Sequence, residues 1–408
     1  MESTSQINSY INKAIKEHYF PGAQLIIGST DGVVFSNDYG YYDYSKKQKV
    51  TDESLYDLAS CTKIFSTTLS VMRLIDEQKI ALTDEISKLL PETDTMKFAG
   101  VTVRELLYHC SGFLPTIPVA TSLVKSKNEN IPLTSRYKSV KNPYCFDKRV
   151  YVCKEIAYDT TFIHFTPKAN DIKISSKLYL DKSYGKKIDS MVIASYNPLR
   201  RGYYKYSDLN FYVLQRIVER VSGKSIDSYA ASIYDKMNIK NIGYTPLLWS
   251  DKSKVIPTEY DCLFRRDTMR GIVHDELACV LGGVAGHAGL FSNANALAQI
   301  CTMFLNGGIA SNSERIVSED VLSQFVAAKK FSSGAIRGLG FDKLSPLSTP
   351  YNEESFGHTG YTGTYFWVDP VKKYYVILLT NRVNPSRANK RLSSDFRGEL
   401  WTMIKNIM

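Results

Sequence analysis

Residues 60–75 read SCTKIFSTTLSVMRLI, and this stretch decides how the rest of the chain is interpreted. It places Ser60 three residues before Lys63, at the start of a long amphipathic run. Because positions i and i+3 lie on the same face of a helix, the spacing brings an amine within reach of a hydroxyl, as an activated serine nucleophile requires. The dipole at a helix N-terminus also favours an oxyanion beside it. A serine that merely begins a helix is the alternative for Ser60 taken alone.

The Ser-x-x-Lys spacing is common and has little weight without its context. It occurs four times, at Ser60/Lys63, Ser122/Lys125, Ser135/Lys138 and Ser183/Lys186. Only the first pair is followed by an amphipathic helix that can bury the lysine stem. The other three lie in polar, Lys-rich sequence, where a solvated surface is the expected environment.

The two ends of the chain predict the same arrangement, antiparallel strands with a helix. Apolar residues at helical spacing between 7 and 15 predict a first helix, and the strands 23–28 and 33 onward flank Asp31-Gly32, a pair suited to a tight turn. The other end contains a strand over 365–368, a turn at Asp369-Pro370, a strand over 375–379 and a helix with Phe396, Leu400 and Ile404.

The middle of the chain has a different pattern. Between about residue 75 and residue 285 it is mostly helical, with a Lys-rich and Tyr-rich stretch at about 115–200. We therefore predict one lobe made from residues 1–75 and 286–408, and a mainly helical inserted lobe made from residues 76–285. A length of 408 residues exceeds one typical core, which fits such a division.

Composition and charge exclude several classes of protein. With 44% hydrophobic and 23% charged residues the chain has ordinary globular usage, so it is neither disordered nor fibrous. The net charge of +10 would suit a polyanion if the basic residues formed one patch, but they are spread, most densely between Lys125 and Lys187. We therefore predict a solvated basic surface and no nucleic-acid partner, and leave attraction to an anionic envelope or polymer open.

Seven cysteines lack Cys-x-x-Cys or Cys/His spacing, so neither a zinc site nor a disulfide scaffold is indicated, although Cys145 and Cys153 could pair across a short loop. The first residues show no basic and apolar pattern of a signal peptide, and no apolar run reaches about 18 residues. We predict no transmembrane segment. A cytoplasmic protein and an exported one with its signal removed are both compatible with the sequence.

Two further motifs favour a catalytic role for Ser60. Tyr206-Ser207-Asp208 precedes a helical run that stops at Gly223, and His358-Thr359-Gly360 precedes a strand. In this order with Ser60-x-x-Lys63, they resemble the serine β-lactamase and penicillin-binding protein superfamily, and most closely its class C β-lactamase, DD-peptidase and esterase branch. The likeness extends over residues 20–23, 103–113, 273–276, 282–292 and 380–382, and it is weakest over residues 115–200, where the family itself varies.

The resemblance implies an α+β fold: an antiparallel sheet with helices on both faces, built from both chain ends, plus a mainly helical lobe. It implies acyl transfer in the groove between them, without a metal or organic cofactor, on a small-molecule or peptide substrate. Ser60 would attack a carbonyl, and Lys63 and Tyr206 would share the acid and base roles. The oxyanion would lie between the backbone N–H groups of Ser60 and Tyr361, and water would hydrolyse the acyl-enzyme.

The sequence departs from the family pattern at Asp208, where Asn is common. An ionised carboxylate cannot donate a hydrogen bond to a substrate carbonyl. It would also favour the ammonium form of Lys63 and make that lysine a poorer base, unless Asn210 substitutes in the site. The alternative is that Asp208 only caps the helix that follows it.

A second departure is His358, which stands where many members have Lys. With Thr359 and Gly360 it is expected to line the substrate site. Its charge would depend on pH, so we predict weaker recognition of substrate carboxylates at about pH 8 than at about pH 6; the alternative is that His358 only orders the strand. His109, His274 and His287 are predicted to be structural, and Arg382 to reach an anionic substrate or a surface acid.

These observations predict a serine hydrolase that acts on an ester, or on an amide such as a D-amino-acid peptide or a β-lactam. An ester is favoured because Asp208 and His358 both weaken the contacts expected for amide and carboxylate groups. The alternative is a catalytically silent relative that binds a cell-wall fragment or a protein partner in the same cleft. Retention of Ser60, Lys63 and Tyr206 together argues against that alternative.

Overall fold

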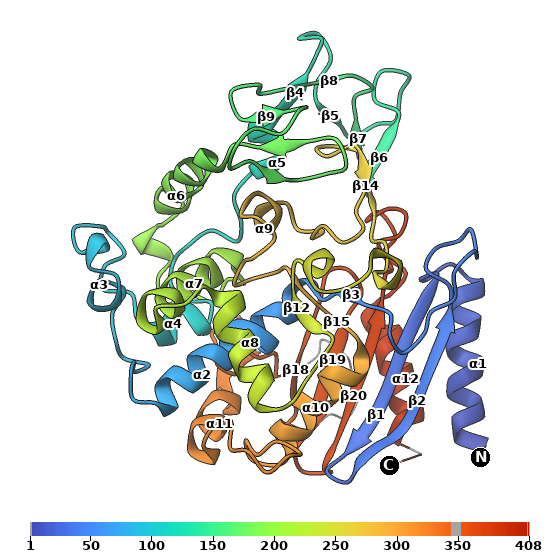
Figure 1. The fold of residues 1–408 in the computed structure, drawn as a ribbon, viewed down its shortest axis with the longest axis vertical. Helices are drawn as coiled ribbons and strands as arrows, with labels where there is room; N and C mark the ends of the chain where they lie inside the picture. The colour runs from blue at the N-terminus through green and yellow to red at the C-terminus, as the bar shows by residue number, and fades with distance from the viewer. Residues whose placement is uncertain (1, 344–351, 406, 408) are drawn as a thin grey trace.

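A computed structural model describes residues 2–343, 352–405 and 407 of the chain. Its main sheet has five antiparallel strands in the order β18-β19-β20-β1-β2, so strands from both chain ends lie side by side (Figure 1). The central pair, β1 and β20, aligns Ile26 with Ile377. The strands of this sheet are β1 (Gly22–Ser29), β2 (Gly32–Gly40), β18 (Phe356–Thr359), β19 (Tyr365–Asp369) and β20 (Tyr374–Thr380).

The alternation of side chains along the strands buries both faces of this sheet. Leu25 and Ile27 belong to one apolar cluster, together with residues of α1 (Glu2–Lys16) and α12 (Ser394–Lys405). Ile26, which points the other way, belongs to the large cluster that includes α10 (Ala294–Leu305). Helices therefore cover both faces, and the predicted α+β fold with an antiparallel sheet is confirmed.

Most of the remaining helices lie beside the sheet and beneath the upper part of the molecule in Figure 1. They are α2 (Leu69–Asp76), α3 (Ile86–Leu89), α4 (Val103–Leu107), α5 (Val119–Leu123), α6 (Gly185–Ala194), α7 (Asp208–Ser222), α8 (Ile226–Lys236), α9 (Glu276–Val280) and α11 (Glu319–Val326). As expected, α7 ends at Gly223, whose φ of 68° places it in the left-handed region that favours glycine.

Short strands complete the framework around the site. A three-stranded sheet contains β3 (Tyr56–Asp57), β15 (Leu290–Ser292) and β12 (Ile242–Tyr244), and it joins the segment before Ser60 to later parts of the chain. Two-stranded sheets are formed by β13 (Tyr260–Asp261) with β14 (Asp267–Thr268), and by β16 (Lys329–Lys330) with β17 (Ile336–Arg337).

The stretch at about 115–200 differs from the mostly helical pattern expected for the middle of the chain. Besides α5 and α6 it contains three small antiparallel sheets, which cap one end of the molecule in Figure 1. Strands of two to four residues are too short for sequence periodicity to reveal. They are β4 (Val124–Ser126), β5 (Thr134–Ser135), β6 (Tyr144–Asp147), β7 (Val150–Val152), β8 (Ile156–Tyr158), β9 (Ile163–His164), β10 (Ile172–Lys173) and β11 (Tyr179–Leu180).

Cys145 and Cys153, the pair that could have formed a bridge, are both free thiols, the first exposed and the second buried. Within the described ranges, no helix combines the length and apolar character needed to cross a bilayer. The same ranges contain no group of three or more His, Cys, Asp or Glu side chains arranged to hold a metal ion.

Candidate active site

Ser60 and Lys63 lie where an irregular helical segment leads into α2. A 3₁₀ turn covers Ala59–Cys61, and a π-helical turn covers Lys63–Thr68. The Lys63 side chain is fully buried, and its Nζ donates to the Ser60 Oγ at 3.0 Å and to the His287 carbonyl at 3.2 Å. The predicted contact between this hydroxyl and this amine is therefore present. A π-turn within a helix is frequent at functional sites.

An ion pair fixes the charge of Lys63. Its Nζ lies 2.7 Å from Oδ1 of Asp208, the first residue of α7, whose side chain is 23% exposed. Burial alone would lower the pKa of Lys63, but the Asp208 carboxylate and Tyr206 together raise it above its ordinary value. Lys63 is therefore an ammonium at neutral pH, as the sequence argument from Asp208 expected. The Asp208 carboxylate is paired with Lys63, and Ser207 is the residue at the N-cap position.

Tyr206 completes the group around the Ser60 hydroxyl. Its own hydroxyl interacts with the side chains of both Lys63 and Ser60. Removal from solvent raises the pKa of Tyr206, although the nearby Lys63 ammonium opposes that rise. His109, predicted to be structural, packs against the Tyr206 ring with 4.6 Å between ring centroids, and its Nδ1 accepts from the Ser207 backbone N–H at 3.1 Å. His109 therefore helps to hold Tyr206 in place.

These residues open onto a cavity of about 470 Å³. It brings together six of the residues predicted for the site, with Ser60 on its wall and Lys63 and Asp208 outside its lining. The cavity is lined by Ser60, Tyr204, Tyr206, Arg337, Asp342, His358, Thr359, Gly360, Tyr361, Arg382, Lys390, Leu392 and Arg397.

The turn that carries Tyr361 is held against the segment that precedes Ser60. The side-chain hydroxyls of Thr362 and Thr364 donate to the carbonyls of Asp57 and Leu58, at 2.7 and 2.9 Å. A Cβ at Gly360 would lie 2.0 Å from the Thr364 hydroxyl oxygen, so no larger residue fits there. This clamp keeps the backbone of the Tyr361 turn close to the Ser60 turn.

The Arg382 guanidinium lines the cavity, as its expected reach toward an anionic substrate requires, and two backbone carbonyls hold it there. Its Nη2 donates to the Tyr361 carbonyl at 2.5 Å, and its Nη1 donates to the Asn389 carbonyl at 2.6 Å. The guanidinium also lies 4.8 Å from the centre of the Tyr361 ring. Arg382 therefore fixes the turn that carries Tyr361.

Two expectations for the substrate site are wrong. Asn210 is fully buried, accepts from the Ser111 hydroxyl at 2.5 Å and lies 3.4 Å from His109 through its amide nitrogen. It does not line the cavity, because a helix turns by about 100° per residue and two positions after Asp208 it faces away from the site. Asn210 therefore cannot replace the missing amide at Asp208.

The pH-dependent charge predicted for His358 is the second error. The ring is 2% exposed, and its Nδ1 lies 2.8 Å from the Thr359 carbonyl oxygen. Burial, together with the nearby charges of Arg337 and Lys63, lowers the pKa of His358 well below its ordinary value. The imidazole therefore stays neutral between about pH 6 and pH 8, and it cannot gain a charge that holds a carboxylate in that range.

The fixed positive charge of the cavity comes instead from Arg382, already expected near an anionic substrate, and from three residues that no motif identified. Arg337, in β17, is 3% exposed, pairs with Asp342 and lies 5.9 Å from the centre of the Tyr206 ring. Arg382, Lys390 and Arg397 add three more cationic side chains to the lining, against the single carboxylate of Asp342. Only the fold brings Arg337, Lys390 and Arg397 together, so spacing in the sequence gave no signal for these three.

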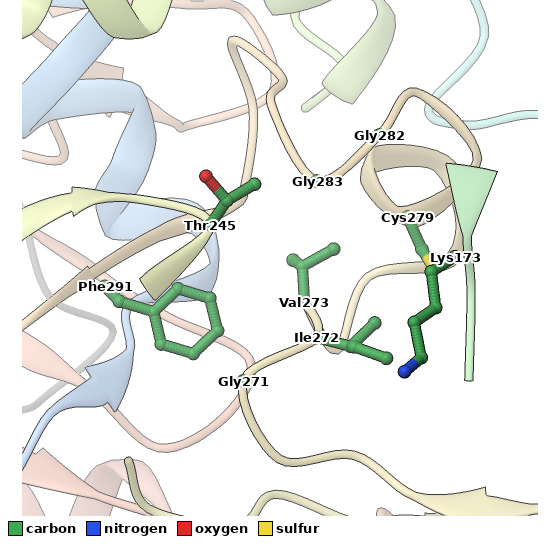
Figure 2. Close-up of a pocket in the computed structure, with 9 residues that line it drawn as sticks. All are labelled: Lys173, Thr245, Gly271, Ile272, Val273, Cys279, Gly282, Gly283 and Phe291. Atoms are coloured by element: carbon green, nitrogen blue, oxygen red, sulfur yellow. The ribbon is translucent and has the colours of Figure 1, made fainter. Parts of the chain in front are cut away.

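A second cavity, of about 70 Å³, lies apart from this group (Figure 2). It is lined by Lys173, Thr245, Gly271, Ile272, Val273, Cys279, Gly282, Gly283 and Phe291. Burial raises the pKa of the Cys279 thiol, which makes a thiolate nucleophile unfavourable. The Ser60 cavity is therefore the better candidate for catalysis.

Comparison with known proteins agrees with the motif order. The sequence model of the Beta-lactamase family matches residues 7–141 and 193–395. A protein of Escherichia coli strain K12, named provisionally as a D-alanyl-D-alanine carboxypeptidase, is 27% identical over 414 residues, which cover 94% of this chain and 83% of that protein. The unmatched residues 142–192 fall within the segment where the resemblance was weakest.

Solved structures show the same fold. An octameric penicillin-binding protein homologue from Pyrococcus abyssi has a TM-score of 0.66 and 19% identity, with 98% of this chain and 77% of that one covered. EstCE1, described as a hydrolase with promiscuous acyltransferase activity, has a TM-score of 0.64 and 19% identity, with 97% and 98% covered. The predicted resemblance to the β-lactamase and penicillin-binding protein superfamily is confirmed.

Proposed function

The chain belongs to the Beta-lactamase family, and on that premise we propose that it is a serine hydrolase that forms an acyl-enzyme on Ser60 and prefers esters to amides. One observation carries the preference: Lys63, 3.0 Å from the Ser60 Oγ, is held as an ammonium by Asp208 at 2.7 Å. The similar proteins include one named provisionally as a D-alanyl-D-alanine carboxypeptidase and, among structures with the same fold, a family VIII carboxylesterase, so the preference has to come from the chemistry of this chain.

In the proposed mechanism, Tyr206 and Lys63 act as one proton-transfer unit. The unit must lose a proton before it can accept the Ser60 proton, and the pKa values of both residues are raised. A base is therefore scarce at neutral pH, which slows attack on unreactive carbonyls. An ester suits such a site, because its carbonyl is more electrophilic than that of an amide and its attack by Ser60 demands less of the base. The backbone N–H groups of Ser60 and Tyr361 would stabilise the oxyanion.

The cavity lining suggests the substrate class. Arg337, Arg382, Lys390 and Arg397 face one carboxylate, so an ester that carries an anionic group would be drawn into this site. Arg337 is well placed to receive that group, because its buried Nε has no hydrogen-bond partner among the described residues. Thr359 and the neutral His358 would contribute hydrogen bonds on the same wall. We expect a small-molecule or peptide ester with a carboxylate or phosphate.

The test is active-site labelling. The folded protein is incubated with a fluorescent fluorophosphonate and with a fluorescent penicillin, and the labelled peptide is identified by mass spectrometry. We expect rapid labelling of Ser60 by the phosphonate and slow labelling by the penicillin. Ser60→Ala should abolish both. Ser183→Ala, which alters an exposed serine with the same Ser-x-x-Lys spacing, is the matched control and should label normally.

Two outcomes would contradict the proposal. If neither probe acylates the folded protein, the chain is a binding protein of the same fold rather than an enzyme. If penicillin labels Ser60 as fast as the phosphonate does, the Lys63–Asp208 pair does not limit amide chemistry. A Lys63→Ala variant should lose most acylation, and full retention would remove Lys63 from the mechanism.

A further inference from the structure

The loop of residues 136–141 combines exposed apolar side chains with basic ones. It joins β5 to β6 in the segment that caps the molecule, at the end away from the two chain termini (Figure 1). Tyr137 is 81% exposed and Val140 is 92% exposed. Arg136, Lys138 and Lys141 alternate with them and are also exposed, and no Asp or Glu occurs between residues 130 and 146. We call residues 136–141 the basic loop.

The base of this loop is well anchored. The buried Asn142 donates from its side chain to the Pro132 carbonyl at 3.0 Å and from its backbone to the Ser139 hydroxyl oxygen at 3.0 Å. The Lys154 backbone N–H donates to the Lys141 carbonyl at 3.0 Å. These bonds tie both sides of the loop to the small sheet beneath it. Tyr137 and Val140 therefore project into solvent from an ordered base.

The segment that contains the basic loop is rich in basic residues. Residues 115–200 contain 15 Lys and Arg against 7 Asp and Glu, so most of the net charge of +10 lies in this one segment. Phe165, elsewhere in the same segment, is 61% exposed. Most of the net charge thus lies in the segment that contains the basic loop, even though the sequence shows no single run of basic residues.

We propose that the basic loop docks the protein on an anionic lipid bilayer. Tyr137 and Val140 would enter the interfacial layer, where amphipathic aromatic and apolar side chains are stabilised, while Arg136, Lys138 and Lys141 contact lipid phosphates. A soluble polyanion would satisfy the three cations but leave Val140 in water. The apolar residues therefore distinguish a bilayer from a polymer or a nucleic acid as the partner.

The docking surface is connected to the active-site cavity. Strand β6 follows the basic loop, and its last residue, Asp147, pairs with Lys390 of the cavity lining at 2.9 Å. Lys390 also donates to the Tyr361 hydroxyl at 3.2 Å. The strand that leaves the basic loop thus ends beside a residue of the cavity lining. The inference does not depend on the identity of the substrate.

The experiment is vesicle co-sedimentation of the full chain, with vesicles of phosphatidylcholine alone and vesicles that also contain phosphatidylglycerol. We expect binding only to the second kind, weakened by added salt. The double variant Tyr137→Ser/Val140→Ser and the triple variant Arg136→Glu/Lys138→Glu/Lys141→Glu should each weaken binding by about tenfold or more. All variants should hydrolyse a soluble ester at the unaltered rate.

The matched control is Val371→Ser/Lys372→Glu. It changes an apolar residue that is 62% exposed and an adjacent exposed lysine, on the β19–β20 turn of the main sheet. This variant should bind vesicles as the unaltered protein does. The proposal is overturned if the loop variants sediment normally, if both kinds of vesicle bind equally, or if the protein binds soluble polyphosphate but neither kind of vesicle.

Discussion

Replacing Asp208 with Asn should convert a slow amide acylator into a faster one. The carboxylate lies 2.7 Å from the Lys63 Nζ, and attraction at that distance is worth about 6 kcal/mol at an effective dielectric constant of about 20. Part of this is offset, because the Asp208 side chain is 23% exposed and a buried ammonium has lost its hydration. We therefore expect the pKa of Lys63 to fall by about 1–2 units, equivalent to about 1.4–2.7 kcal/mol.

Each unit raises the neutral fraction of Lys63 about tenfold below its pKa, so acylation by the fluorescent penicillin should rise by about 10–100-fold near neutral pH. The rate is measured as a time course of Ser60 labelling across the alkaline range. The alkaline limb of the pH profile should move to lower pH in the variant. Acylation by the phosphonate, whose reactivity demands less of the base, should rise less.

Asp208→Ala separates the two effects of the substitution. It removes the charge as Asn does, but it offers no amide to donate to a substrate carbonyl. If Asn and Ala accelerate acylation equally, charge is the whole cause, and any excess with Asn measures the amide contact. An unmoved alkaline limb in both variants, with no gain in rate, would refute the claim that the protonation of Lys63 limits the reaction.

Three further outcomes are expected. Arg337→Gln should raise KM about tenfold for an ester that carries a carboxylate and leave KM for a neutral ester unchanged. If steady-state kinetics show the same change in KM for both esters, Arg337 does not bind the anionic group. Burial lowers the pKa of His109 and His358 well below 6.5, so below about pH 6.5 the unfolded chain binds more protons than the folded one. The free energy of unfolding in urea should therefore fall from about pH 6.5 to pH 5, by up to about 1.4 kcal/mol per unit for each histidine, and His109→Gln should flatten that slope. Gly286→Ala should lower the free energy of unfolding by about 1–3 kcal/mol, because the added Cβ would lie 2.2 Å from the Phe211 carbonyl oxygen. Gly185→Ala is the control: no atom lies within 4 Å of its added Cβ, so this variant should unfold at the same urea concentration as the unaltered protein.

The main sheet was predictable from the sequence because its strands are long and their patterns are local. Strands β1 and β20 have eight and seven residues, and apolar residues predominate in both, with Gln24, Ser29 and Thr380 as polar exceptions. The stop at Gly223 follows from the conformational freedom of glycine, whereas the first hairpin turns one residue earlier than expected, at Thr30-Asp31, and Gly32 pairs with Ser29 at a φ of 122°. The small sheets between residues 115 and 200 could not be predicted in the same way. Their strands form through pairing across the segment, such as Val124 with Tyr158, which no local pattern encodes.

The features of the candidate site likewise separate into those that local sequence predicts and those that depend on distant segments. The Ser60–Lys63 contact was predictable from helical spacing. The ion pair between Lys63 and Asp208 was predictable because an acidic residue occupies the third position of the Tyr206-Ser207-Asp208 motif. Asn210 was misjudged because adjacency in sequence does not give the same helix face. His358 was misjudged because its exposure, and hence its charge, depends on atoms contributed by distant segments. Arg337 could not be found from the sequence at all.

The charges of this site are distributed so that the attraction of an anionic substrate and the catalytic proton transfer depend on different residues. Lys63 and Asp208 neutralise each other behind Ser60, so they add little to the field in the cavity. The neutral His358 adds no charge either, and the attraction for an anion comes from the arginines and the lysine of the lining. Arg337 is linked to the strand of His358 through Asp342, whose backbone pairs with both Arg337 and Gly357. At neutral pH, where Lys63 keeps its proton and His358 stays neutral, the charges that attract an anion do not change, so KM for an anionic ester should stay nearly constant between about pH 6 and pH 8.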